Sequence, residues 1–322
     1  MIKEIVSNLY CIELPLPQSP LKYINCYVIK GKDRSLIIDT GMNREECKSA
    51  LFPALKELKV DMAKTDLFIT HLHADHFGLT GDLATPTSKC YVGRIDAEMI
   101  RGGHFWQELL QIYAKNGFPE EVLKKSMAGH PGIIYNSQRA IELTPVDDGQ
   151  KIEVGDFELQ CIDTPGHSPG HACLYEANKK ILFSGDHILF DITPNITYWM
   201  LMKDALRSYL ASLDKVAHLE VKNVLPGHRK SWHNHQGRIE ELKKHHRHRL
   251  DEALAALKER EMTAYEVAPH ITWKIEFAHW DDFPIVQKYF AFGETLAHLY
   301  YLENDGLIKS YSKNGHTYFA LA

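Results

Sequence analysis

The segment HLHADH, residues 71–76, places three imidazoles and one carboxylate within six positions, directly after the apolar run 67–69. His71 and His73 alternate, so on an extended segment their side chains point the same way and could hold one ion. Asp75 and His76 follow where we expect a helix to begin, and they could hold a second ion. Imidazole and carboxylate suit zinc, iron or manganese. A polar loop is the alternative, because the chain has 19 histidines.

Ligand-type side chains also follow three further apolar runs. The run 157–162 leads into DTPGHSPGH, which contains His167 and His171. The run 181–183 leads into SGDH, which contains Asp186 and His187, and 224–225 leads into PGH, which ends at His228. Small, turn-forming residues after apolar runs are typical of strand ends. We therefore expect four strand ends to converge on one edge of a sandwich.

The ordered motifs HLHADH, TPGHSPGH, SGD and PGH resemble those of the metallo-β-lactamase superfamily, and more closely its glyoxalase-II-like hydrolases. The resemblance spans residues 1 to about 230. It implies an α/β fold, an αββα sandwich, with two divalent metal ions between the sheets; zinc is the first choice, and iron or manganese are alternatives. The ligand set that it implies is His71, His73 and His167 for the first metal, Asp75, His76 and His228 for the second, and Asp186 as the bridge.

Three further residues near these motifs lie outside that ligand set. His171 matches a position that is usually structural in this superfamily. His187 matches no ligand position, and it is either a substrate contact or a histidine adjacent to the site. Asp39 matches a position near the metals, although an acidic turn residue there is nearly as good an explanation.

Length and composition predict an ordinary globular protein with one large and one small domain. The chain has 322 residues, of which 44% are hydrophobic and 25% charged. A net charge of -5 gives no general attraction to nucleic acid or anionic membranes. No apolar stretch approaches the roughly 18 residues of a membrane span, and the N-terminus lacks a signal-peptide core. Six cysteines without paired spacing indicate free thiols in a reducing cytoplasm.

We expect a metallo-β-lactamase-fold domain over residues 1–236. Strands are expected at 5–14, 24–30, 35–39 and 65–69, and a helix at 43–58. The span 94–136 reads as an insertion of two or three short, apolar helices. It forms either a lid or wall over the substrate pocket or an ordinary packed layer. In the loop 189–200, Tyr198 could donate a hydrogen bond to a developing oxyanion, although aromatic loop residues more often anchor packing.

Residues 237–322 predict a second, winged-helix-like domain: a long helix at 237–260, a short one at 264–267, a helix at 284–303 and a hairpin around Asn314-Gly315. Some metallo-β-lactamase-fold hydrolases carry such a module, including relatives of a mitochondrial single-strand endoribonuclease. Its eleven Lys and Arg against thirteen Asp and Glu argue against nucleic-acid binding. We expect a packing, dimerisation or pocket-building surface instead, and we expect His245, His246 and His248 to lie on a solvated helix face.

These observations predict a metal-dependent hydrolase that acts on a small molecule, with a homodimer as one option. Two cations sharing a water would make hydroxide available to attack a carbonyl, and Asp75 could orient the nucleophile and carry its proton. A carboxylic ester, thioester or lactone is the expected substrate. The alternatives are a metal-dependent single-strand nuclease and a non-hydrolytic, iron-dependent dioxygenase of the same fold.

Overall fold

The computed structural model of the chain describes residues 2–103, 106–230, 233–274 and 279–322. The chain divides into two compact units. The sandwich unit comprises residues 1–102, 131–194 and 212–238, and the helical unit comprises 103–130, 195–211 and 239–322.

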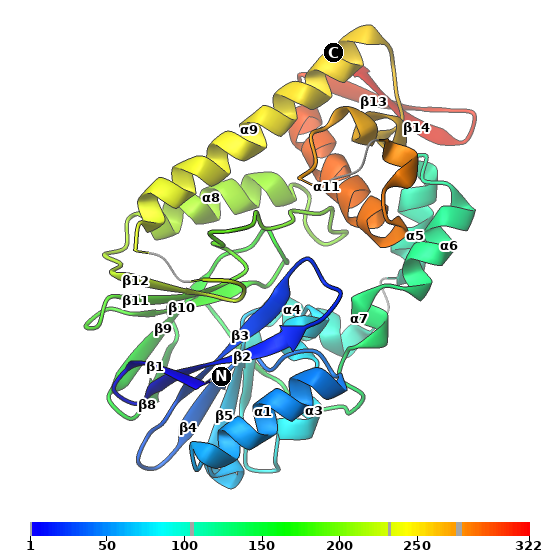
Figure 1. The fold of residues 1–322 in the computed structure, drawn as a ribbon. Helices are drawn as coiled ribbons and strands as arrows, with labels where there is room; N and C mark the ends of the chain where they lie inside the picture. Colours follow the sequence, from blue (N-terminus) through cyan, green and yellow to red (C-terminus); the bar gives the residue numbers. More distant parts are fainter. Residues whose placement is uncertain (1, 104–105, 231–232, 275–278) are drawn as a thin grey trace. The chain divides into compact units, whose positions relative to one another are not determined.

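The sandwich unit contains a seven-stranded sheet in the order β1-β2-β3-β4-β5-β6-β7 (Figure 1). Its strands are β1 (Ile2–Val6), β2 (Leu9–Leu16), β3 (Lys22–Ile29), β4 (Ser35–Ile38), β5 (Thr65–Ile69), β6 (Cys90–Gly93) and β7 (Thr144–Val146). The first four strands pair antiparallel, and β4 to β7 pair parallel. Parallel strands are buried on both faces, which explains why every residue of β4 and β5 is buried.

The second sheet has the order β12-β11-β10-β9-β8. Its strands are β8 (Lys151–Val154), β9 (Phe157–Asp163), β10 (Ala172–Glu176), β11 (Ile181–Gly185) and β12 (Asn223–Pro226). Inward-facing residues of both sheets, among them Ile29, Phe68, Leu159 and Phe183, form one apolar cluster between them. Burial of this cluster is what holds the two sheets face to face.

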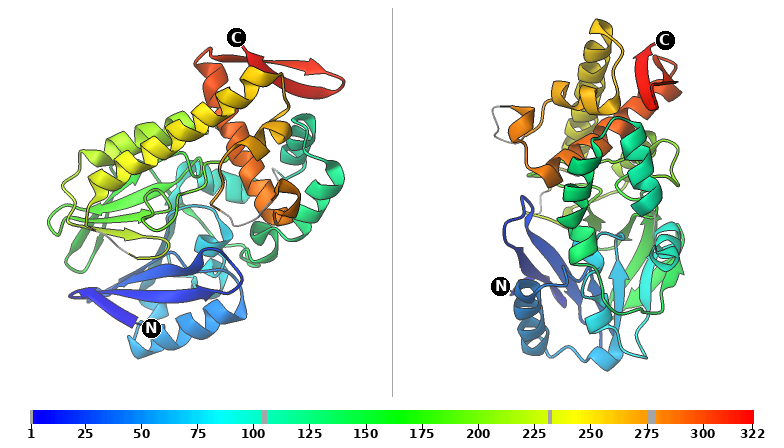
Figure 2. Two further views of the ribbon diagram at one scale, coloured as in Figure 1. Left: turned by 45° about the horizontal axis from the view of Figure 1, so that its top comes forward. Right: turned by 90° about the vertical axis from the view of Figure 1, so that its right-hand side faces the viewer.

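Helices cover the outer faces of the sheets. Figure 2 shows α1 (Glu45–Glu57) beside the first sheet, and its Leu51 and Leu55 pack in a second apolar cluster with residues of β2 and β5. The short elements on this side are α2 (Ala74–Phe77), α3 (Thr80–Leu83), α4 (Arg94–Gly102), α7 (Pro131–Ile134) and the 3₁₀ turn η1 (Met62–Lys64). Beside the second sheet, Ser212 of α8 (Ala205–Ala217) donates to Pro165 O over 2.9 Å. This layering confirms the expected αββα sandwich.

The helical unit has its own apolar core. Its elements are α5 (Trp106–Lys115), α6 (Glu120–Ala128), most of α9 (His235–Glu259), α10 (Ala264–Val267), the 3₁₀ turns η2 (Ala268–His270) and η3 (Trp280–Asp282), α11 (Ile285–Asn304), β13 (Ile308–Lys313) and β14 (His316–Leu321). Phe292 and Leu296 of α11 pack with Tyr113 of α5 and Leu123 of α6. Asn314 and Gly315, with φ of 52° and 80°, make the tight turn of the hairpin.

Two expectations about individual elements are wrong. The strand expected over 5–14 is two strands, because the chain turns between β1 and β2 at Asn8, whose φ is 64°. Over its described residues, the insertion contains four helices, α4 to α7, where two or three were expected. Its helices α5 and α6 belong to the core of the helical unit. The lid, the domain boundary at 236 and 237 and the winged-helix likeness stay predictions.

His246 also differs from expectation. Its side chain is fully buried, whereas His248 on the same helix is exposed, as expected. His246 lies against the Tyr209 ring and against His298 of α11, so neighbouring helices cover this face of α9.

All six cysteines are buried free thiols. None of the helices in the described ranges has the length and apolar character that a membrane crossing requires.

Candidate metal centre

The predicted ligand residues converge because strands of both sheets end at the same edge. His71 follows β5, and Asp186 and His228 follow the parallel strands β11 and β12. Two backbone hydrogen bonds join the sheets at this edge: Ala172 N donates to Thr70 O over 2.9 Å, and Asn25 N donates to Gly227 O over 2.7 Å. Residues separated by more than 150 positions are thereby brought together.

His71, His73 and His167 form the first group, in which one ligand-type atom of each residue lies within 4.8 Å of the others. His71 Nε2 and His73 Nδ1 are 2.9 Å apart. Burial and, to a smaller degree, the nearby His167 lower the pKa of His73 to about 3. Burial and neighbouring imidazoles also hold the pKa of His71 well below its usual value. Neutral imidazole is the form that offers a lone pair to a metal.

Asp75, His76 and His228 form the second group, again within 4.8 Å. Asp75 Oδ2 is 3.1 Å from His228 Nε2 and 3.9 Å from His76 Nε2. Burial by itself would raise the pKa of Asp75, but the facing imidazoles of His76 and His228 lower it below its usual value. The Asp75 carboxylate is therefore ionised. Burial alone would lower the pKa of His76, but the carboxylates of Asp39, Asp186 and Asp75 hold it well above its usual value, so these carboxylates attract a positive charge to His76 Nε2.

Asp186 lies between the two groups. Its Oδ1 is 3.6 Å from His76 Nε2, and its Oδ2 is 3.6 Å from His167 Nε2 and 3.5 Å from His228 Nε2. Each carboxylate oxygen therefore faces a histidine of the second group, and Oδ2 also faces the first.

Two histidines of the second group are oriented by hydrogen bonds from their other nitrogen. His76 Nδ1 donates to Asp39 Oδ2 over 2.8 Å, and His228 Nδ1 donates to the carbonyl of Tyr23 over 2.8 Å. Both bonds direct Nε2 toward the carboxylates, which is the usual arrangement of metal-binding histidines. The hydrogen bond from His76 favours a position of Asp39 near the metals over an ordinary acidic turn residue.

This set of donors fits divalent metal ions. Ligand atoms around a tetrahedral ion with bonds of about 2.0–2.1 Å lie roughly 3.3 Å apart, close to the 3.5–3.6 Å that separate Asp186 from its three histidine neighbours. Among the described residues, His76 Nε2 and Asp186 Oδ1 are buried and have no hydrogen-bond partner. Buried polar atoms without a partner are costly, and a cation between them would remove that cost.

Comparison with known proteins agrees with this geometry. The family model for the Metallo-beta-lactamase superfamily matches residues 20–228. The chain belongs to the metallo-beta-lactamase superfamily. With the full set of ligand-type residues present, this superfamily member is a metal-dependent hydrolase.

Three relatives of this superfamily member have names that describe hydrolases. A probable metallo-hydrolase of Bacillus subtilis is 26% identical, covering 91% of this chain and 92% of its own length. An acyl-coenzyme A thioesterase of Homo sapiens is 27% identical over 63% of this chain and 72% of its own length. An atrochrysone carboxyl ACP thioesterase of Emericella nidulans is 25% identical over 66% of this chain and 56% of its own length.

A solved structure matches along the whole chain. The crystal structure of a metallo-beta-lactamase family protein from Thermus thermophilus is 28% identical, with a TM-score of 0.83, and covers 99% of this chain and 100% of that one. The match includes the C-terminal helices as well as the sandwich.

The remaining histidines predicted near the site of this superfamily member lie beside it. His171 Nε2 accepts a hydrogen bond from Asp186 N over 3.2 Å, so its Nδ1 donates to Thr164 Oγ1 over 2.8 Å. This agrees with the structural role expected for His171. His187 is fully buried next to the His171 ring.

Tyr198 is not among the clustered residues and belongs to the helical unit. It packs in that unit's apolar core against the Tyr300 ring, and its backbone N donates to Gly293 O over 3.0 Å. Burial raises the pKa of its phenol. The structure gives Tyr198 a packing role, and its contact with an oxyanion stays a prediction.

Thr70 is a site residue that the sequence motifs did not indicate. Its hydroxyl is 2.9 Å from Asp39 Oδ2 and 3.1 Å from His71 Nδ1, and its backbone N donates to Asp39 Oδ1 over 2.8 Å. The signal was its position, directly between β5 and His71.

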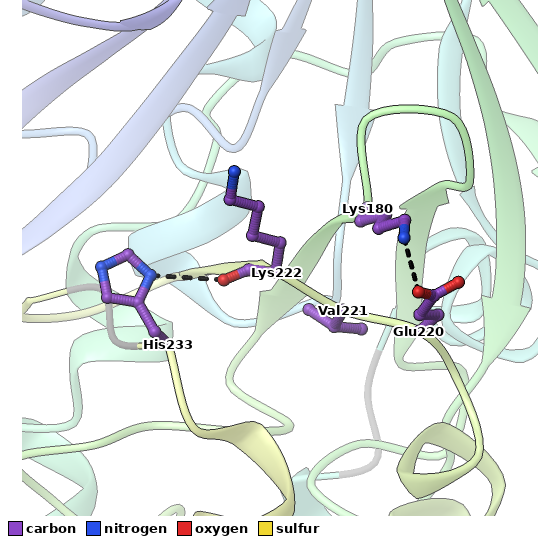
Figure 3. A pocket seen from close by; sticks show the side chains of 5 residues that line it. All are labelled: Lys180, Glu220, Val221, Lys222 and His233. Carbon is purple, nitrogen blue, oxygen red and sulfur yellow. Dashed lines mark hydrogen bonds and ion pairs between the residues drawn. The ribbon is translucent and has the colours of Figure 1, made fainter.

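A surface hollow of the sandwich unit lies elsewhere (Figure 3). It is lined by Lys180, Glu220, Val221, Lys222 and His233. Lys180 directly precedes β11 and Lys222 directly precedes β12, whereas Asp186 and His228 follow the other ends of these strands. The hollow is therefore at the opposite strand ends from the metal centre.

Proposed function

We propose that this protein is a dinuclear, zinc-dependent hydrolase of carboxylic thioesters. The observation that carries the proposal is the position of Asp186, whose oxygens face histidines of both groups. The names of the human and fungal relatives support thioesters as the substrate class. The first zinc would be held by His71, His73 and His167, the second by Asp75, His76 and His228, with Asp186 shared between them.

Two zinc ions, when bound, would lower the pKa of a shared water and polarise the carbonyl oxygen of the substrate. The protein's own contribution is to orient that water and to manage its proton. We assign this role to Asp75: it would be a ligand of the second zinc, and its free oxygen would accept a hydrogen bond from the water and take up its proton. A thiolate with a pKa near 8.5 is a good leaving group, so a thioester needs less proton transfer than an ester does.

A substrate panel tests the proposal. The zinc-reconstituted protein is assayed with an acyl-coenzyme A thioester, a matched ester, a lactone and a single-stranded oligonucleotide. We expect the highest kcat/KM for the thioester. Faster turnover of the ester or lactone would contradict the substrate class alone, and faster turnover of the oligonucleotide would favour a nuclease. Turnover that requires iron and dioxygen would favour the dioxygenase.

The isosteric change Asp186→Asn tests the shared carboxylate. We expect one zinc equivalent to be lost, and kcat/KM to fall by more than the roughly 10–100-fold that removal of an outer hydrogen-bond partner costs. Elemental analysis and thioester turnover measure both effects. Asp66→Asn is a matched control, because Asp66 is a buried carboxylate at the opposite end of β5 from His71. Equal losses in the two variants would contradict a specific role for Asp186.

A further inference from the structure

Asp96 is a fully buried carboxylate that the proposed chemistry does not use. It lies in the first turn of α4, directly after β6, and none of its side chain reaches solvent. A buried charge is expensive unless it is hydrogen-bonded, so its partners indicate why it is retained.

The partners of Asp96 come from both loops that carry the first group of histidines. Oδ2 accepts from Leu72 N over 2.9 Å and from the Ser168 hydroxyl over 2.7 Å. Leu72 stands between His71 and His73, and Ser168 directly follows His167. One carboxylate oxygen therefore joins the two segments that must meet around one ion.

The other oxygen of Asp96 fixes the second loop more firmly. Oδ1 accepts from Gly170 N over 2.6 Å. A side chain at position 170 would collide with the backbone N of Asp96, and one at Gly93 would collide with the carbonyl of Gly170. Glycine at both positions lets the start of α4 approach the loop closely. The contact between the start of α4 and the 167–170 loop therefore depends on the two glycines as well as on the Asp96 carboxylate.

We propose that Asp96 is a positioning residue that holds the 71–73 and 167–170 segments together and so sets the zinc affinity of the first group. The inference rests on the proposed metal centre. The second group has separate supports, since Asp39 orients His76 and the Tyr23 carbonyl orients His228. Loss of Asp96 should therefore weaken zinc binding at the first group and leave zinc binding at the second group unchanged.

Zinc binding by the full-length Asp96→Asn variant tests this inference. Asn keeps the size of the side chain, but its amide nitrogen cannot accept from the donors that surround Asp96. In competition with a chelator, we expect one equivalent to keep its wild-type affinity and the other to bind about 10–100-fold more weakly. Ser168→Ala removes a single donor, so it should weaken the same equivalent to a smaller degree. It also provides the test if Asp96→Asn does not fold.

The control is Asp66→Asn, since Asp66 accepts hydrogen bonds from Arg34 and Lys89 at the far end of β5. It should leave both zinc affinities unchanged even if thermal stability falls. Wild-type affinity for both equivalents in Asp96→Asn, or equal weakening in Asp66→Asn, would overturn the inference. Absence of zinc binding in the wild type would overturn the proposed function itself, and with it this inference.

Discussion

The side chains at the metal centre depend on partners one hydrogen bond away. His76 is the clearest case, because Asp39 fixes which of its nitrogens faces Asp186. Asp39 adopts a left-handed φ of 58°, which Asp and Asn tolerate better than most residues. Directly after β4, Asp39 therefore both adopts the backbone conformation of the turn and orients His76.

Asp39→Asn isolates the charge of this side chain, because Asn can keep the same backbone conformation. We expect the zinc affinity of the second group to fall by about 10–100-fold, since the His76 ring loses its carboxylate acceptor. Competition with a chelator measures the effect. Unchanged affinity would show that the hydrogen bond from His76 does not support binding.

The sequence predicted the candidate ligand residues, but it did not predict the residues that position them through hydrogen bonds. His71, His167 and His228 were found because they belong to short motifs after apolar runs. Thr70 and Asp96 could not be found in this way, since a lone Thr or Asp beside a strand has many ordinary roles. Their importance depends on hydrogen bonds to residues distant in sequence.

At the scale of elements, amphipathic spacing located most helices and strands but did not show which helix faces are covered. His246 stands among charged residues of α9, which predicts a solvated face, yet it lies against α11. There His298 Nδ1 donates to Glu294 O over 2.7 Å, so His298 Nε2 accepts from His246 Nδ1 over 3.1 Å. This chain of bonds requires the His298 imidazole to be neutral, because its Nε2 must keep a free lone pair.

The buried pair makes stability depend on pH. Burial and, to a smaller degree, the nearby Arg249 lower the pKa of His298 to about 3. Burial also holds the pKa of His246 well below its usual value. The other groups facing the pair are His245 on α9, the Tyr209 ring on α8, and Glu294, which is paired with Arg249.

Because the folded pKa is depressed, the stabilisation is present above the unfolded value near 6.5 and is lost as pH falls toward 3. For one histidine this amounts to about 2 kcal/mol between pH 6.5 and 5. His298→Gln should lower the free energy of unfolding at pH 7.5 and flatten its decline below pH 6.5. Urea unfolding across this range measures both changes, and parallel pH profiles for the two proteins would refute the assignment.

At the scale of the whole molecule, the sequence predicted a sandwich followed by a smaller C-terminal part. It did not predict that segments 103–130 and 195–211 group with that part. This grouping depends on tertiary packing. The sequence shows that Tyr113 and Leu123 are large side chains suited to a core, but only the fold shows that they pack with Phe292. The net charge of -5 and the family membership agree with a small-molecule hydrolase.

The zinc content of the reconstituted wild-type protein decides whether the centre is dinuclear. After removal of metal with a chelator, incubation with excess zinc and exhaustive dialysis, we expect two tightly bound equivalents per chain, measured by elemental analysis. A content of one equivalent or fewer would contradict the dinuclear centre built around Asp186.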